Sequence, residues 1–305
     1  MSAPAFRFPS AVPADALPSP SVASGVVTRL RWDDCDRSQY IADHLDGLQP
    51  AVVLGAIDHW PSREKWTPQF FKDCYGALEV TIDGRAWRLA ELIDRIVAST
   101  PEHPAPYLRN QPLGRWPREL LADVSPLPRC IRPNYLESPL FPARGSQISL
   151  ELYIGGAGAA FPMLHYDFRH MHAFLMQIHG TKEYVVFAPD QERYLYPRPG
   201  IEGNKSSIPD IENVDRARFP LYAHAKGMRF LLNAGETLFV PGGWWHTARI
   251  LTTSITVSVN GASAGNWVQY RRDYCAGIAQ WSPIKAGVVN AYLALLGALL
   301  SIFET

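Results

Sequence analysis

The sequence predicts a mainly β protein in which a barrel of short antiparallel strands is flanked by helices. Residues 174–178 and 183–187 are apolar runs joined through Gly180, a pattern typical of a hairpin in such a barrel. Further along, residues 235–240 read as a turn followed by an apolar strand. Residues 255–260 then alternate between apolar and polar side chains, as a half-buried strand does.

Helices are predicted before and after this barrel. Residues 51–57 read as a buried strand, and the next stretch has a cap residue at Thr67, a proline at Pro68 and a glycine at Gly76, which together indicate a short helix. Apolar side chains at helical spacing over residues 89–97 predict a second helix with one face turned inward. We expect both helices to be scaffolding.

Composition favours one large domain with helical additions over two small domains, because the chain has 305 residues. Lys plus Arg number 29, and Asp plus Glu also number 29, so the formal charges cancel. The chain thus lacks the excess of basic residues that would indicate a nucleic-acid partner, and none is expected. The cysteines are far apart and show no paired spacing, which favours reduced thiols and a cytoplasmic location over a disulfide framework or a zinc cluster. They are Cys35, Cys74, Cys130 and Cys275.

The two ends of the chain carry different signals. Residues 1–25 contain five prolines with Ala and Ser and have no basic start before an apolar run, which predicts a flexible leader and neither a signal peptide nor a membrane anchor. Residues 266–274 are expected to form a helix across the core. Residues 286–303 are mostly Ala, Leu, Val and Gly, at the lower edge of the length that spans a bilayer. The spacing of Leu293, Leu296, Leu300 and Phe303 predicts one apolar stripe.

The strongest chemical signal is a histidine and an aspartate two residues apart. If residues 163–167 form a strand, His165 and Asp167 point to the same face. A second histidine from a distant strand, His246 after the turn at residues 241–245, would complete two histidines and one carboxylate on one face of a metal. That arrangement, with open positions opposite, is typical of non-haem Fe(II) oxygenases. Taken alone, a His-X-Asp triplet is more often a surface or core pair.

Several further motifs occur in the same order as in a known family. They are Pro50-Ala51-Val52-Val53-Leu54, Trp60-Pro61, Lys65-Trp66, Gly180-Thr181-Lys182-Glu183, Phe187-Ala188-Pro189-Asp190-Gln191, Leu195-Tyr196-Pro197, Phe219-Pro220-Leu221 and Pro241-Gly242-Gly243-Trp244-Trp245-His246. With them the chain resembles the JmjC/cupin-like family of Fe(II)- and 2-oxoglutarate-dependent oxygenases, within it the branch of the asparaginyl hydroxylase that inhibits hypoxia-inducible factor. The resemblance implies a double-stranded β-helix, or jelly-roll barrel, over residues 26–262, followed by a helical segment at 263–305.

The resemblance also implies the activity. It predicts a dioxygenase in which His165, Asp167 and His246 hold Fe(II), and in which O2 and 2-oxoglutarate are consumed as succinate forms. Hydroxylation of a peptide, a protein side chain or an amino-acid-like molecule is the expected reaction, with N-demethylation and a small metabolite as alternatives. Because related hydroxylases pair two subunits through C-terminal helices, a homodimer is expected through residues 286–303, with a membrane tail as the alternative.

Three residues are candidates for binding the co-substrate. A dicarboxylate in a partly dry barrel needs a cation, and Lys182 matches the anchoring lysine of the family. The wider superfamily also uses an arginine about ten residues beyond the distal histidine, where this chain has Thr256. The resemblance implies that Tyr107 donates to the far carboxylate, unless it is a packed core tyrosine. It also makes Asn260 an active-site asparagine, unless Asn260 is a polar strand terminus.

The chain departs from the hydroxylase pattern at two places. The stretch after Asp167 is two residues longer up to Gln177 and lacks the expected asparagine, so His170 or His172 is expected to take its polar role. Pro162 stands where the family often has a cofactor-binding threonine. Candidates for contact with substrate, or for support of the metal ligands from behind, are Arg169, His170, His172 and Trp245.

Two other classes of function compete with the oxygenase. One is a metal-holding barrel without oxygenase activity, either a binding module or an isomerase. An open pocket facing Lys182 would favour the enzyme, and a filled barrel would favour the module. The other is a membrane-tethered interaction protein, which rests only on the apolar tail at residues 286–303.

Overall fold

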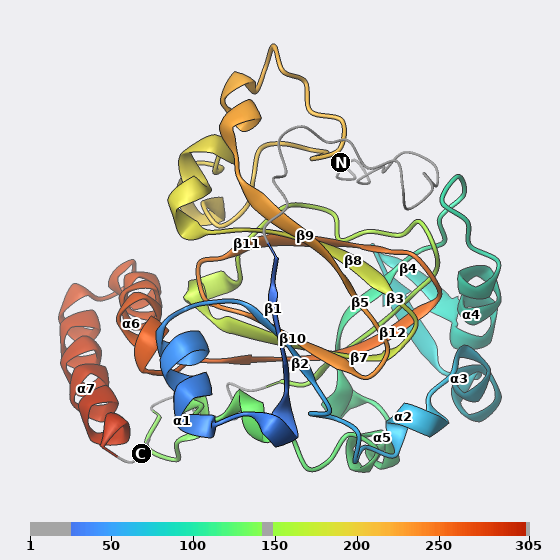
Figure 1. The fold of residues 1–305 in the computed structure, drawn as a ribbon, viewed down its shortest axis with the longest axis horizontal. Helices are drawn as coiled ribbons and strands as arrows, with labels where there is room; N and C mark the ends of the chain where they lie inside the picture. Colours follow the sequence, from blue (N-terminus) through green and yellow to red (C-terminus); the bar gives the residue numbers. More distant parts are fainter. Residues whose placement is uncertain (1–25, 142–148, 303–305) are drawn as a thin grey trace.

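The structure, a computed structural model, describes residues 26–141 and 149–302, and the predicted leader at residues 1–25 lies outside this part. Two β-sheets form a jelly-roll barrel with helices around it, which confirms the predicted fold class (Figure 1). The larger sheet has the order β1 (Thr28–Arg31), β2 (Ala51–Leu54), β10 (Glu236–Val240), β7 (His172–His179), β12 (Ser254–Gly261), β6 (Glu151–Gly155) and β5 (Leu108–Pro112). The smaller sheet has the order β11 (Trp245–Ile250), β8 (Lys182–Phe187) and β9 (Gly227–Leu232).

Every strand pair in the two sheets is antiparallel except β1 with β2. The predicted hairpin corresponds to β7 and β8, which belong to different sheets, so the turn between them closes one end of the barrel. Gly180 lies in this turn with φ of +73°, and a Cβ there would lie 2.0 Å from the backbone oxygen of Thr253. Only glycine fits both constraints without a shift of the neighbouring backbone.

The predicted strand over residues 163–167 is wrong. His165 alone in that stretch forms an isolated bridge, and Asp167 begins a short 3₁₀ turn, η6 (Phe168–His170). The segment still pairs with β11, because Ala160 bridges Arg249 and His165 bridges His246. This chain segment therefore acts as an irregular fourth strand beside the smaller sheet.

Helices cover the outside of the barrel. They are α1 (Arg37–Tyr40), α2 (Ser62–Lys65), α3 (Pro68–Tyr75), α4 (Leu89–Val97), α5 (Arg118–Ala122), α6 (Ala264–Ala279) and α7 (Pro283–Ser301), with a separate hairpin of β3 (Glu79–Ile82) and β4 (Arg85–Arg88). The predicted helices α3 and α4 are confirmed, and Thr67 caps α3 by accepting a hydrogen bond from the Phe70 N–H. Both pack on the main hydrophobic core under the larger sheet.

The two C-terminal helices form a hairpin that packs on one end of the barrel (Figure 1). Leu293 and Leu296 of α7 are buried against Trp267 and Tyr270 of α6, so this part of the predicted stripe faces the chain's own helix. The prediction that the stripe pairs with a twin helix is therefore wrong for these residues, and Phe303 lies outside the described residues. By length and composition, α7 is long and apolar enough to cross a membrane. Of its most apolar 18-residue stretch, 22% is buried inside the structure.

Candidate metal and co-substrate site

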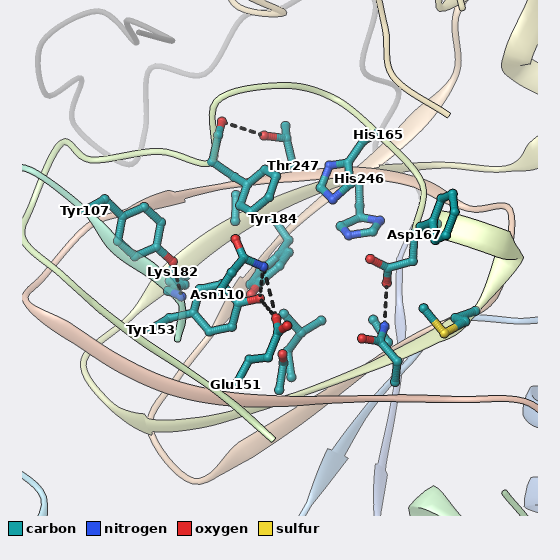
Figure 2. A pocket seen from close by; sticks show the side chains of 18 residues that line it. Tyr107, Asn110, Glu151, Tyr153, His165, Asp167, Lys182, Tyr184, His246 and Thr247 are labelled. Carbon is teal, nitrogen blue, oxygen red and sulfur yellow. Dashed lines mark hydrogen bonds between the residues drawn. The ribbon is translucent and has the colours of Figure 1, made fainter. Parts of the chain in front are cut away.

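Three side chains at the mouth of the barrel converge on one point. One ligand atom from each of His165, Asp167 and His246 lies within 4.8 Å of the others (Figure 2). The two histidines are neighbours across paired backbone, because the His165 N–H donates to the His246 carbonyl at 3.1 Å and the His246 N–H donates back at 2.6 Å. Backbone pairing thus brings together two residues that are far apart in sequence.

Each imidazole is oriented by a carbonyl behind it. His165 Nδ1 lies 3.2 Å from the Met163 carbonyl, and His246 Nδ1 lies 3.1 Å from the Trp244 carbonyl. Because a carbonyl oxygen can only accept, Nδ1 carries the proton in both rings and Nε2 keeps its lone pair. Burial, together with the charge of His246, lowers the pKa of His165 well below its usual range, so the ring is neutral. Imidazoles whose Nδ1 is fixed in this way are suited to bind a metal through Nε2.

Asp167 is held by an asparagine that the sequence left with two interpretations. Asn260 donates from Nδ2 to Asp167 Oδ2 at 3.3 Å and to the His172 carbonyl at 3.1 Å. Burial raises the pKa of Asp167, and the hydrogen bond from Asn260 favours the ionised carboxylate. Asn260 also lines the cavity, so the structure places it beside the candidate ligands and not at a plain strand terminus.

The barrel holds an open cavity of about 240 Å³, the space of roughly eight water molecules at about 30 Å³ each. Side chains from both sheets line it (Figure 2). They belong to Tyr107, Asn110, Glu151, Tyr153, Phe161, His165, Asp167, Phe168, Met171, Ala173, Leu175, Lys182, Tyr184, His246, Thr247, Ala248, Ser258 and Asn260. The metal candidates and Lys182 therefore face one cavity, and the barrel is not filled.

Lys182 lies deep in this cavity and is 2% exposed. Its Nζ donates to the Tyr107 hydroxyl at 3.0 Å and lies 5.5 Å and 5.6 Å from the ring centroids of Tyr107 and Tyr153. Within the described ranges no carboxylate forms an ion pair with Lys182. Burial lowers the pKa of Lys182 to about 7. An ammonium group without a carboxylate partner in a buried pocket is suited to bind an anionic ligand.

Tyr107 lies at the same end of the cavity. Burial raises the pKa of Tyr107, so its hydroxyl keeps its proton and can donate to an anion. The tyrosine is 8% exposed and immediately precedes β5. The Tyr107 ring thus packs in the wall of the cavity, while its hydroxyl accepts the hydrogen bond from Lys182.

Four residues predicted to contact substrate or to support the metal ligands from behind do not line the cavity. They are Arg169, His170, His172 and Trp245. His172 and Trp245 are 1% and 0% exposed, and Trp245 packs against Tyr166 in the core behind the smaller sheet.

His172 instead supports the turn that precedes His246. Its Nδ1 accepts a hydrogen bond from the Gly242 N–H at 3.0 Å, and its Nε2 donates to the Ser263 hydroxyl at 3.1 Å. Burial lowers the pKa of His172 to about 3, which keeps this pattern neutral. Gly242 passes so close to η6 that a Cβ would lie 2.1 Å from the His170 carbonyl. One polar contact of the His172 ring is therefore with the backbone turn that precedes His246, and the other is with the residue that caps helix α6.

Arg169 and His170 tie η6, directly after Asp167, to helix α6. His170 Nδ1 lies 2.7 Å from Asp273, and the Asn266 side chain donates to the His170 carbonyl at 2.8 Å. The Arg169 guanidinium lies 4.8 Å from the ring centroid of Tyr274. Contacts from α6 thus fix the segment that positions the candidate carboxylate ligand.

Sequence reasoning missed part of the polar wall, which is made by Asn110, Glu151, Tyr153, Tyr184, Thr247 and Ser258. One signal was available, because Glu151 and Tyr153 are two residues apart in an otherwise apolar run and therefore share a face of β6. Where the family often has a threonine, Pro162 offers no hydroxyl. The hydroxyls of Thr247 and Ser258 face the cavity instead.

The donor set fits a divalent transition metal. Two imidazoles and one carboxylate on one side leave the cavity side open, and that combination is suited to Fe(II) with vacant positions for other ligands. Asn260 and the two backbone carbonyls provide the outer contacts that such ligands usually have. The chemistry of these residues therefore agrees with Fe(II), the metal that the family resemblance implies.

Comparison with known proteins identifies the family. Residues 37–261 match the model of the cupin-like domain. The chain belongs to the JmjC/cupin-like family. This cupin-like chain is 30% identical over 235 residues to lysine-specific demethylase 8 from Xenopus tropicalis, covering 73% of the chain and 51% of that protein. It is 30% identical over 233 residues to lysine-specific demethylase JMJ30 from Arabidopsis thaliana, covering 72% of the chain and 51% of that protein.

A third relative is covered over more of its length. The human tRNA wybutosine-synthesizing protein 5 is 28% identical over 251 residues, which is 75% of the cupin-like chain and 76% of that protein. The chain spans about half the length of the two demethylases. The comparisons thus show that the chain belongs to the cupin-like family. The three relatives are named for different activities, demethylation of lysine and synthesis of tRNA wybutosine.

We predict that the three candidate ligands bind a divalent metal as a unit. His165→Ala, Asp167→Ala or His246→Ala should abolish binding of Mn(II), measured by calorimetric titration. Asn260→Ala should weaken it by about 10- to 100-fold, because an outer contact orients the ligand without touching the metal. His103→Ala, at an exposed position, is the matched control and should bind as the native chain does. Native-like binding by the Asp167→Ala protein would contradict the assignment.

Proposed function

We propose that this chain is an Fe(II)- and 2-oxoglutarate-dependent dioxygenase that hydroxylates a peptide, a protein side chain or an amino-acid-like molecule. The observation that carries the proposal is one open cavity with the three candidate ligands at one end and a buried lysine, without a carboxylate partner among the described residues, at the other. That separation suits a short dicarboxylate, which can reach the metal with one end and the ammonium with the other.

Each group has a distinct role in this proposal. His165, Asp167 and His246 would hold Fe(II), which supplies the redox chemistry that couples loss of carbon dioxide from 2-oxoglutarate to oxidation of a substrate C–H bond by O2. Lys182 would neutralise the far carboxylate, and the Tyr107 hydroxyl would donate a second hydrogen bond to it. Asn260 would keep Asp167 aimed at the metal.

The main rival is a metal-holding barrel that only binds a ligand. An open cavity that both Lys182 and the three candidate ligands line supports the enzyme, since a filled barrel is what a module without a reaction would show. A second reaction, N-demethylation, needs the same residues, and it is favoured by two relatives that are named lysine-specific demethylases. The product separates these two reactions: a gain of one oxygen marks hydroxylation, and loss of a methyl group marks demethylation.

The test is turnover with a mass-spectrometric readout. The native chain with Fe(II), O2 and 2-oxoglutarate should form succinate, and a screen of peptides and amino acids should yield a product heavier by one oxygen atom. Asp167→Ala should lose succinate formation while keeping the native thermal unfolding midpoint, and His103→Ala should retain it. Succinate formation by Asp167→Ala at the native rate, or no succinate from the native chain, would contradict the proposal.

A pH dependence follows from the low pKa of Lys182. Above about pH 7 the free chain has a neutral lysine, so binding of a carboxylate must take up a proton. The Kd for 2-oxoglutarate should then rise with pH, by up to about tenfold per pH unit, and stay low below pH 7. Calorimetry across this range measures it.

Two variants isolate the contribution of this lysine. Lys182→Ala should raise the Kd by about one to a few orders of magnitude and abolish this part of the pH dependence. Lys226→Ala, an exposed lysine, should leave both unchanged. An identical pH profile in the native chain and in Lys182→Ala would show that another group binds the far carboxylate.

We also propose that the chain is a cytoplasmic homodimer that pairs through the exposed side of α7. Ile284, Val288, Leu295 and Leu299 lie on that side, and their exposed fractions range from 43% to 84%. All four cysteines are free thiols, which favours a reducing compartment. Light scattering without detergent should give about twice the 34.0 kDa chain mass, and Leu295→Glu should give the monomer mass. A native monomer, or solubility only in detergent, would contradict the dimer.

A further inference from the structure

A carboxylate that neither the metal nor the co-substrate requires lies in the cavity wall. Glu151 begins β6 and lines the same cavity as the candidate ligands (Figure 2). Its Oε2 accepts hydrogen bonds from the Tyr153 hydroxyl at 2.8 Å and from Asn110 Nδ2 at 3.0 Å. Both donors are neutral. Among the residues the structure describes, no cationic side chain pairs with Glu151, and Oε1 accepts no hydrogen bond.

The backbone around this carboxylate is specialised. The pairing of β5 with β6 shifts register between Leu108 and Gln111, and Asn110 within this irregular stretch has φ of 52°. A bulge of this kind redirects a side chain, and asparagine tolerates left-handed backbone better than most residues. The result is that the Asn110 amide reaches Glu151 and also the Tyr153 hydroxyl, at 2.8 Å. Two polar side chains, one from each strand, thus hold the Glu151 carboxylate in place.

Lys182 does not neutralise Glu151. The centroid of the Tyr153 ring lies 5.6 Å from Lys182 Nζ, and the Tyr153 hydroxyl donates a hydrogen bond to Glu151. The tyrosine side chain therefore lies between the lysine and the carboxylate. The ammonium contacts the Tyr107 hydroxyl instead. The cavity therefore has a cationic end and a separate anionic wall.

The charges then do not balance when the proposed ligands are bound. The ferrous ion brings two positive charges and Lys182 brings one, whereas 2-oxoglutarate brings two negative charges and Asp167 and Glu151 bring one each. One negative charge is left over among these groups, and the partly exposed Glu151 carboxylate faces the cavity where a ligand of opposite charge could pair with it. A ligand carrying one positive charge removes this excess.

We propose that Glu151, held by Asn110 and Tyr153, selects a substrate with a cationic side chain, an ammonium or a guanidinium group. The inference rests on the proposed function for the positions of metal and co-substrate, and it narrows the substrate class. The aromatic rings of Tyr153 and Phe168 line the same cavity and add favourable faces for a cation. A neutral side chain of equal size would leave Glu151 without a cationic partner and bind less well.

The test compares matched probes on the full chain loaded with Mn(II) and 2-oxoglutarate. Nα-acetyl-lysine amide is paired with Nα-acetyl-norleucine amide, and Nα-acetyl-arginine amide with Nα-acetyl-citrulline amide, so each pair differs in charge at similar size. Calorimetry should give at least one cationic probe a Kd lower than its neutral partner by about tenfold or more. Which pair shows the preference distinguishes ammonium from guanidinium.

Glu151→Gln keeps the shape and removes the charge, so the preference should fall to within about twofold. Glu79→Gln, an exposed glutamate on β3, is the control and should keep it. Equal Kd values for charged and neutral probes on the native chain, a preference that survives in Glu151→Gln, or no binding of any cationic probe at millimolar concentration would overturn the inference. The native-chain comparison needs no variant to fold.

Titration of 2-oxoglutarate itself separates this inference from the proposed function. Glu151→Gln should bind 2-oxoglutarate at least as tightly as the native chain, because a negative charge has been removed. A Kd raised by about tenfold or more would make Glu151 a co-substrate contact and overturn the substrate assignment. If the native chain fails to bind 2-oxoglutarate, the proposed function is wrong, while the ratio of probe affinities on the metal-loaded chain still decides the role of Glu151.

Discussion

The reciprocal backbone hydrogen bonds between His165 and His246 are the contact on which the site depends. They join an irregular segment to the first residues of β11 and thereby set the separation of two imidazoles whose ring centroids lie 4.5 Å apart. The backbone carbonyl contacts of the two rings occupy Nδ1 of each and leave Nε2 as the nitrogen available to a metal. The third candidate ligand, Asp167, and the residues that hold it are placed relative to these two histidines.

The carboxylate is brought to the pair by a different device. Asp167 lies beyond the last bridge to β11, where the chain turns into η6, and contacts from helix α6 hold that turn. Asn260 on β12 completes the support from the larger sheet. The C-terminal helices therefore contribute to the geometry of the mouth of the barrel as well as to the surface of the molecule, which links the apolar end of the chain to the chemistry.

The cavity separates charges of opposite sign along its length. A buried ammonium lies at the closed end, neutral hydroxyl and aromatic groups lie between, and carboxylates lie near the ligands and on β6. Low exposure strengthens each interaction and makes each unpaired charge costly. Lys182 thus favours an anionic group at one end of the cavity, and the proposed preference for a cationic substrate follows from the same physical constraint at Glu151.

The sequence by itself determined the barrel, the helices α3 and α4 and the three candidate ligands, because these depend on local signals: alternation of apolar residues, caps and turns, and a few residue types in a fixed order. The sequence did not determine which residues near the candidate ligands face the cavity. The expected strand at residues 163–167 is an irregular bridge, and His172 and Trp245 turn into the core, since cross-strand pairing overrides local pattern.

Only the tertiary structure decided the polar wall. Asn110 and Glu151 lie 41 residues apart and meet through an irregular register between β5 and β6 that no local pattern encodes. In the same way, Leu293 and Leu296 are spaced as any amphipathic helix spaces them, and the packing of Trp267 alone decides that they face α6. Spacing along the chain limits which residues share a face, while long-range pairing decides what that face meets.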